Sequence, residues 1–151
     1  MKIGFTGTQK GMTPHQHKSV YLMLSEELPE EIHHGDCIGA DDEVHNIASE
    51  LRIKIVIHPP IKGGKRAFRL GDESRPEQHY LVRNQQIVNE TDVLIATPKS
   101  NKEELRSGTW STIRYAMRET RMAVRIVWPN GNVSIWNEGG EMDGLQASKQ
   151  G

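Results

Sequence analysis

The stretch Arg106–Thr109 has the residue types that hold phosphate groups in proteins. Ser, Gly and Thr at the start of a helix offer hydroxyls, free backbone N–H groups and the positive end of the helix dipole, which all favour an anion. A helix capped by Ser or Thr is the competing interpretation, but it leaves Arg106 and Gly108 without a role. We therefore expect Arg106, Ser107, Gly108 and Thr109 to bind phosphate.

A second group of glycines and hydroxyls occurs near the N-terminus. Thr6-Gly7-Thr8 follows a short apolar run, and a glycine there lets backbone N–H groups approach a ligand closely. A tight turn with hydroxyl caps explains the same residues equally well. Thr6, Gly7 and Thr8 are candidate ligand-binding residues.

The segment from Gly35 to Asp42 holds two glycines and three carboxylates. Asp36 lies in the loop itself, where it could accept hydrogen bonds from ribose hydroxyls. Asp41 or Asp42 could instead cap the following helix, which would explain one of them without a ligand. Gly35, Asp36, Gly39 and Asp41 are candidate ligand-binding residues, and Asp36 is also a candidate catalytic group.

Potential metal ligands are gathered at the beginning of this segment. His33, His34, Asp36 and Cys37 lie on one short stretch, and no matching second cluster is visible in the sequence. Structural zinc sites usually take their ligands from two such stretches. The sequence therefore predicts neither a metal site nor a cofactor.

Cations follow the third apolar run of the chain. Lys62, Lys65, Arg66 and Arg69 occur within eight residues, a density that suits either a phosphate clamp or a solvated surface loop. We expect Arg66 and Arg69 to close over the ligand.

Arg83 and Asn84 differ from these cations because they lie inside a segment of helical period. Tyr80, Leu81 and Ile87 surround them, so part of this turn is expected to face the sheet. An inward-facing Arg near strand ends would be a phosphate partner or a catalytic group. Arg83 and Asn84 are candidate ligand-binding residues, and Arg83 is the second candidate catalytic residue.

Short apolar runs alternate with helix-period segments along the chain, a pattern typical of parallel α/β sheets. Strands are expected at residues 2–5, 31–34, 54–57, 93–96 and 123–128, and a short edge strand could follow at 133–136. We predict a Rossmann-like three-layer α/β/α fold with a mainly parallel five-stranded sheet. Ligands of such sheets bind outside the carboxyl ends of the strands, where the candidate residues lie.

Composition limits the remaining possibilities. A chain of 151 residues with 35% hydrophobic residues suits one domain, expected at 1–137 and followed by a disordered tail at 138–151. The formal net charge of -1 disfavours nucleic acid as a partner. The single cysteine and the lack of a long apolar run predict a cytoplasmic protein without membrane contact.

The order of the motifs resembles the SLOG superfamily, which includes the LOG-type phosphoribohydrolases and the DprA proteins. The resemblance covers roughly residues 1–130 and rests on Thr6-Gly7-Thr8, Gly35-x3-Gly39-Ala40-Asp41, Arg83-Asn84, Asp92–Ala96 and Gly108-Thr109. It implies a Rossmann-like sheet that binds nucleotides or their derivatives at the strand ends. It also implies that Arg83 corresponds to the essential Arg of the LOG enzymes.

The chain departs from the LOG enzymes in the segment that corresponds to their PGGxGTxxE motif. Lys99-Ser100 replaces the Gly pair, and the position of the catalytic Glu falls on Thr112. Cleavage of an N-glycosidic bond passes through an oxocarbenium-like state that a carboxylate stabilises and Thr does not. The carboxylates that could replace the missing Glu are Asp36, Asp41, Glu103 and Glu104.

Three functions are compatible with these residues. The first is a sensor, carrier or sequestering protein for a nucleotide-derived small molecule, such as an immune signal that a phage protein depletes. The second is a LOG-like hydrolase of nucleoside monophosphates, and the third is a DprA-like binder of single-stranded nucleic acid. The missing Glu favours binding over catalysis. The resemblance also implies a homo-oligomer, for which Trp110 and Tyr115 could form an interface or simply pack in the core.

Overall fold

The computed structural model describes residues 1–137 and 142–143. The strands are β1 (Lys2–Gly7), β2 (Glu31–His34), β3 (Lys54–Ile57), β4 (Glu73–Ser74), β5 (Val93–Thr97), β6 (Ala123–Val127), β7 (Val133–Trp136) and β8 (Met142–Asp143). The helices are α1 (Pro14–Glu27), α2 (Ala40–Glu50), α3 (Tyr80–Asn89) and α4 (Gly108–Tyr115), and a π-helical turn, η1 (Ala116–Thr120), continues α4.

All eight described strands form one sheet in the order β4-β3-β2-β1-β5-β6-β7-β8. The pairs from β4 to β6 are parallel, and β7 and β8 join in antiparallel fashion. The chain moves outward from β1 to β4 and then returns to the other side of β1 with β5. The point between β1 and β5 is therefore the topological switch point, beside which ligands of α/β sheets bind.

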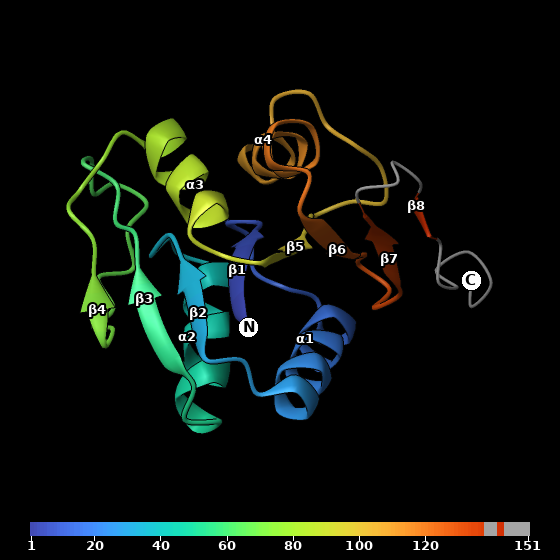
Figure 1. Ribbon diagram of the computed structural model, residues 1–151, viewed down its shortest axis with the longest axis horizontal. Coiled ribbons are helices and arrows are strands. Elements are labelled where there is room, and N and C mark those ends of the chain that lie inside the picture. Colours follow the sequence, from blue (N-terminus) through green and yellow to red (C-terminus); the bar gives the residue numbers. More distant parts are fainter. Residues whose placement is uncertain (138–141, 144–151) are drawn as a thin grey trace.

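Figure 1 shows α3 and α4 on one side of the sheet and α1 and α2 on the other. Apolar residues of α1 and α2 pack on one face around Ile3 and Phe5, and those of α4 pack on the other face around Leu94 and Ile126. The predicted three-layer α/β/α fold with a mainly parallel sheet is confirmed, and the strand expected at 133–136 is present as β7, although β8 and not β7 lies at the edge.

The structure adds strands β4 and β8, which the sequence did not predict. Glu73 and Ser74 are both exposed, so β4 carries no apolar pattern that could indicate a strand. Met142–Asp143 pairs with β7, whereas the rest of the tail expected to be disordered lies outside the described residues.

The first helix begins as its sequence indicates. The Thr13 hydroxyl accepts a hydrogen bond from the Gln16 amide, the Gln16 side chain accepts one from the Thr13 amide, and Pro14 is the first helical residue. Gln16 also donates to the backbone of Pro98 and Val127, so this capping box attaches α1 to the ends of β5 and β6. In the part of the chain that the structure describes, no helix has the length and apolar character needed to cross a bilayer.

Candidate functional site

A cavity of about 890 Å³ opens at the carboxyl ends of β1, β2, β3 and β5, beside the switch point. Its walls come from the loop after each of these strands and from the first two turns of α3. Eleven of the predicted ligand-binding residues line it, namely Thr6, Gly7, Thr8, Gly35, Asp41, Arg83, Asn84, Arg106, Ser107, Gly108 and Thr109. The structure thus brings together residues that lie up to a hundred positions apart in the sequence.

The loop after β1 is held tightly against the start of α2. The Thr8 carbonyl accepts hydrogen bonds from the amides of Gly11 and Ala40, at 3.1 and 3.0 Å. Gly39 has φ of 88°, and a side chain there would collide with the carbonyl of Gln9. Gly39 therefore joins the two loops and does not itself line the cavity.

Asp41 stabilises the loop after β2. Its Oδ2 accepts hydrogen bonds from the amides of Gly35 and Cys37, both at 3.2 Å. Gly39 is the N-cap of α2 and Asp41 lies within the helix, so neither Asp41 nor Asp42 caps it. The second oxygen of Asp41, Oδ1, is buried without a hydrogen-bond partner among the described residues. Burial raises the pKa of Asp41 to about 6, although the nearby Arg83 opposes the shift.

Arg83 faces inward, as the apolar residues around it indicate. It is 6% exposed, and its Nη1 donates hydrogen bonds to the carbonyls of Gly35 and His58. Its Nε donates to the Asn84 side chain at 2.7 Å, and its Nη2 lies 3.7 Å from the Cys37 sulfur. A side chain at Gly35 would collide with this guanidinium. Arg83 therefore connects α3 to the loops after β2 and β3, and the same guanidinium borders the cavity.

Cys37 is the thiol of the site. It lines the cavity beside Arg83, and burial raises the pKa of its thiol. A thiol with a raised pKa is a poor nucleophile at neutral pH. Cys37 is therefore a wall residue rather than a reactive group.

Three other predicted residues lie beside the cavity and hold the loop after β3 in place. The buried Asp36 carboxylate accepts hydrogen bonds from the Arg66 side chain at 2.7 Å and from the Arg69 amide at 2.9 Å. The Arg69 side chain binds Asp42 and Asn46 of α2. The structure places Asp36, Arg66 and Arg69 outside the cavity lining, with their polar groups already engaged in holding the loop after β3 onto α2.

The start of α4 has the geometry expected of a phosphate-binding helix. The Ser107 hydroxyl accepts a hydrogen bond from the Trp110 amide, so it is the N-cap. Gly108 has open space where a side chain would be, and its amide and that of Thr109 are the first two of the helix, which have no intrahelical partner. Thr112 is buried, donates back to the Gly108 carbonyl and does not line the cavity. Helix α4 therefore offers anion-binding amides but no carboxylate.

Several cavity residues did not stand out in the sequence as binding candidates. The cavity is lined by six cations and two carboxylates, namely Lys10, Lys62, Lys65, Arg83, Lys99 and Arg106 against Asp41 and Glu104. The basic run after β3 was visible in the sequence, but its lysines line the cavity while its arginines hold the loop. Only the fold of the loop decides which cations face inward.

Buried histidines form two pairs in the half of the sheet around β2. His34 Nε2 lies 2.9 Å from His45 Nδ1, and His33 Nδ1 lies 2.8 Å from His58 Nε2. Burial lowers the pKa of all four, that of His58 to about 3. The sequence showed no second group of metal ligands to match the one that includes His33. In the structure, His58, after β3, and Glu90, at the end of α3, lie beside His33.

Three solved structures share this architecture. A molybdenum cofactor binding protein from the phototrophic bacterium Rippkaea orientalis matches with a TM-score of 0.65 and 19% identity, over 84% of this chain and 76% of that one. The structural-genomics target TM1055 matches with a TM-score of 0.59 and 14% identity, over 82% and 71%. DNA processing protein A (DprA) from Streptococcus pneumoniae matches with a TM-score of 0.58 and 18% identity, over 83% of this chain but 49% of its own.

The chain has the Rossmann-like α/β fold that these three structures share. Identities below 20% establish the fold alone, and the chain spans about half the length of DprA. No protein-family model and no curated protein sequence matches the chain. Within this fold, Trp110 is 6% exposed and packs near Trp128, so it belongs to the core, while the Tyr115 hydroxyl donates to Asn89.

Proposed function

We propose that the protein binds a phosphorylated, nucleotide-derived small molecule in the cavity at the carboxyl ends of the strands, as a sensor, carrier or sequestering protein. The observation that carries the proposal is the start of α4, where the first backbone amides have no intrahelical partner and Ser107, Gly108 and Thr109 line a cavity whose charged side chains are mostly cations. Such a helix N-terminus binds phosphate through its N–H groups and its dipole.

The charge balance of the cavity favours an anionic ligand. Of its six cations, Lys99 is 3.9 Å from Glu104, and Arg83 is engaged by backbone carbonyls. The others, Lys10, Lys62, Lys65 and Arg106, have no carboxylate within salt-bridge distance among the described residues. Cations that converge on a partly enclosed site attract phosphate more strongly than cations in open solvent.

The size and walls of the cavity suit the rest of a nucleotide. A volume of about 890 Å³ lies within the range of small-molecule sites, roughly 300–1,000 Å³. Phe5, Pro60, Ile61, Tyr80 and Ile87 give it apolar walls against which a base or similar ring can pack. The likeness to a molybdenum cofactor binding protein supports a small organic ligand over a metal-only or protein partner.

A ligand panel tests this function. The protein is incubated with nucleoside monophosphates, ADP-ribose-type compounds and cyclic dinucleotides, while thermal unfolding and chromatography of the products are recorded together. A melting temperature that rises with the ligand recovered intact supports binding without turnover. The ligand-induced increase in melting temperature should be smaller in Arg106→Met and unchanged in Arg118→Met. Both arginines are exposed, but only Arg106 lines the cavity.

A second function, hydrolysis of an N-glycosidic bond, is favoured by one observation. Asp41 lines the cavity, and with a pKa of about 6 it is partly protonated near neutral pH, as a general acid or base requires. Release of free base in the same panel, abolished in Asp41→Asn, would establish this function in place of simple binding. A strong, salt-dependent shift with single-stranded DNA would instead indicate a nucleic-acid binder.

A further inference from the structure

Three side chains with metal-binding atoms converge on the α3 side of the sheet, away from the cavity lining. His33 lies on β2, His58 follows β3 and Glu90 caps the end of α3. The Glu90 Oε1 lies 3.9 Å from both His33 Nδ1 and His58 Nε2, which are 2.8 Å apart. We propose that His33, His58 and Glu90 bind a divalent transition-metal ion, with Zn²⁺ the best fit to this ligand set.

The ligand types agree with zinc. Two imidazoles and one carboxylate are a common zinc ligand set, with the fourth position taken by water. Both imidazoles are fully buried, and burial keeps them in the neutral form in which a ring nitrogen has a lone pair to offer. Glu90 is one-third exposed, so the site borders solvent on that side.

The distances are close to those of a filled site. Ligand atoms bound at about 2.0–2.1 Å to a tetrahedral ion stand roughly 3.3 Å from one another. His33 and His58 would separate by about half an ångström and Glu90 would approach by a similar amount. Rotations of the side chains supply such movements without displacing β2, β3 or α3.

The surroundings of the histidines resemble the second shell of a metal centre. Glu31 Oε1 lies 2.8 Å from His33 Nε2, so a carboxylate orients this ring and leaves Nδ1 as its lone pair. His58 Nδ1 has no hydrogen-bond partner among the described residues. Because His33 Nδ1 is a lone pair, His58 Nε2 donates the hydrogen bond between the two rings, and binding of an ion there requires this proton to move to His58 Nδ1.

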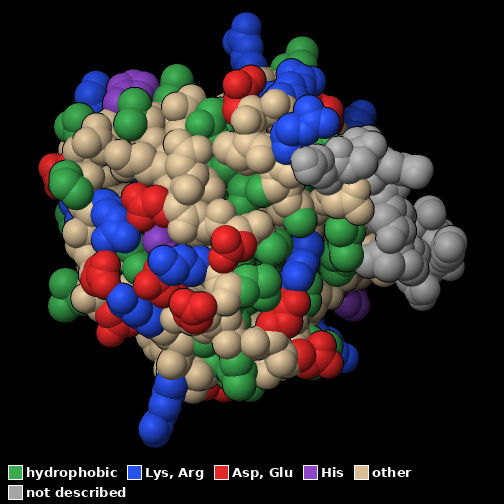
Figure 2. Space-filling model, viewed as in Figure 1, with side chains coloured by type: hydrophobic (Ala, Val, Ile, Leu, Met, Phe, Trp, Pro, Cys, Tyr) green, Lys and Arg blue, Asp and Glu red, His purple; other side chains and the backbone are tan. Residues whose placement is uncertain are grey.

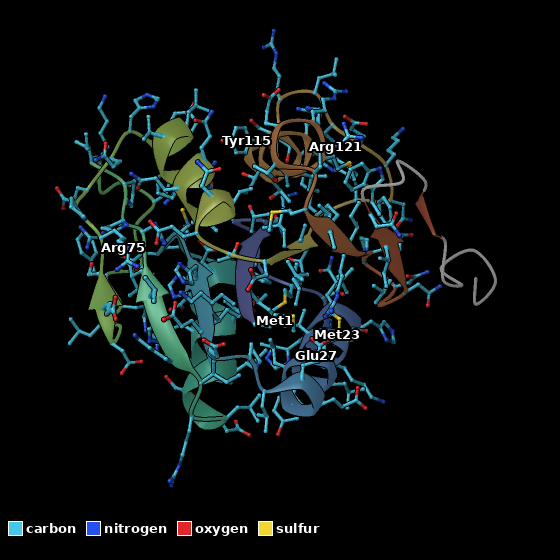
Figure 3. The ribbon with its side chains drawn as sticks, in the orientation of Figure 1. Met1, Met23, Glu27, Arg75, Tyr115 and Arg121 are labelled. Carbon is cyan, nitrogen blue, oxygen red and sulfur yellow. The ribbon has the colours of Figure 1, made fainter. Side chains whose placement is uncertain are left out.

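Charged groups around the cluster come from several elements. Arg75, which Figure 3 labels beside β4, donates to the Glu90 Oε1, and Lys54 pairs with Glu31. Figure 2 shows acidic and basic side chains intermixed on this face, over β3 and β4. The oxygen nearest the histidines is the same Oε1 that Arg75 holds, so to bind the ion Glu90 must rotate until one oxygen meets the ion and the other meets Arg75.

Metal binding here would also affect the position of Arg83 at the cavity. The carbonyl of His58 accepts a hydrogen bond from Arg83, which borders the cavity. An ion on His58 would hold the chain after β3 in the position that Arg83 requires. An ion there would attach α3 to β2 and β3 and keep one position for water, and its binding does not depend on the ligand proposed above.

The test is metal binding by the full chain. The protein is stripped with a chelator, titrated with Zn²⁺ and separately with Co²⁺, and followed by metal analysis, visible absorption of tetrahedral Co²⁺ and thermal unfolding. One ion per chain is expected, with the melting temperature raised by roughly 5–10 °C at a hundredfold excess over Kd.

Matched variants separate this site from incidental metal binding. Glu90→Gln should lose the ion, while Glu73→Gln, which removes the other carboxylate of Arg75, should keep it. His58→Gln should also lose it, while His45→Gln, from the other buried histidine pair, should keep it. Should His58→Gln fail to fold, the partly exposed Glu90 decides the question. An ion retained in Glu90→Gln, or none bound by the unaltered protein, would overturn the proposal.

Discussion

The two halves of the sheet differ in what they bury. Between residues 33 and 83 the buried polar residues are His33, His34, Asp36, Asp41, His45, His58 and Arg83, all of which can ionise. Between residues 93 and 136 they are Thr97, Thr109, Thr112 and Ser134, which are neutral hydroxyls. Both halves also have an apolar core cluster, and that of the second half includes Trp110, Ile113 and Ile126.

One half of the sheet therefore has buried ionisable groups that shape the loops of the site, whereas the buried polar groups of the other half are neutral. An apolar cluster gains stability from burial alone, whereas buried ionisable groups are costly unless they are bonded to one another or to the backbone. In the half around β2, the buried ionisable groups form hydrogen bonds that shape the loops after β2 and β3. The half around β5 and β6 contributes the start of α4, whose amides need no charged side chain to attract phosphate.

The largest effect is expected at the group that connects the two loops. Arg83→Met leaves the carbonyls of Gly35 and His58 without their charged donor, which should lower the free energy of unfolding by about 3 kcal/mol. At the size of this chain, the melting temperature should fall by roughly 6–12 °C. Differential scanning calorimetry measures this change.

Arg125 is the matched control for Arg83 in the other half. It makes two hydrogen bonds to Glu27 of α1, which Figure 3 labels, at the edge of the solvent. Arg125→Met should cost less than about 1 kcal/mol, as is usual for ion pairs near the surface. Equal losses in the two variants would contradict the distinction between the halves.

The next effect concerns pH, because only the ionisable half should respond to it. The pKa of Asp41 is raised from 3.8 to about 6, so the folded state binds the proton more tightly than the unfolded state. Stability from this group is complete below the unfolded value and is lost as the pH rises through about 6. Relative to the unaltered protein, Asp41→Asn should therefore gain roughly 1 kcal/mol between pH 5 and 6.5.

Urea denaturation at several pH values measures this difference. Thr112→Val, in the other half, is the control, because a hydroxyl does not titrate in this range. A difference between Asp41→Asn and the unaltered protein that stays constant with pH would show that Asp41 has an ordinary pKa.

The last comparison, which includes the smallest expected change, concerns two glycines of the cavity. A methyl group at Gly35 would meet the Arg83 guanidinium, so Gly35→Ala should cost about 1–3 kcal/mol. A methyl group at Gly108 would meet nothing, so Gly108→Ala should change stability by less than about 0.5 kcal/mol while obstructing the phosphate site. Comparable destabilisation by both substitutions would show that Gly35 does not depend on Arg83.

The elements that the sequence predicted were those with a clear period or cap. Strands β1, β3, β5 and β6 are mainly apolar runs, whereas β2 has a single apolar residue, Ile32; α1 begins at a Thr-Pro pair that forms a capping box. Strand β4 has only two residues, both exposed, so no pattern could indicate it. Its pairing depends on β3 and on the fold of the loop before it.

The candidate site was predictable where residues follow strands directly. Gly7, Gly35 and Gly108 were found because chain order places them at the same edge of a parallel sheet. The loop after β3 was not predictable in detail. Arg66 binds Asp36, which is thirty residues away in the sequence, while the neighbouring Lys65 lines the cavity. The cluster of His33, His58 and Glu90 was missed for the same reason.

The central claim, a phosphate bound at the start of α4, is tested most directly by isothermal titration of the protein with nucleotides and with the corresponding nucleosides. We predict binding of one nucleotide per chain, with the nucleoside weaker by roughly tenfold or more because it lacks the charge-assisted bonds of the phosphate. Gly108→Ala should remove most of that preference. Equal affinity for nucleotide and nucleoside, or no binding of any nucleotide in the panel, would contradict the account.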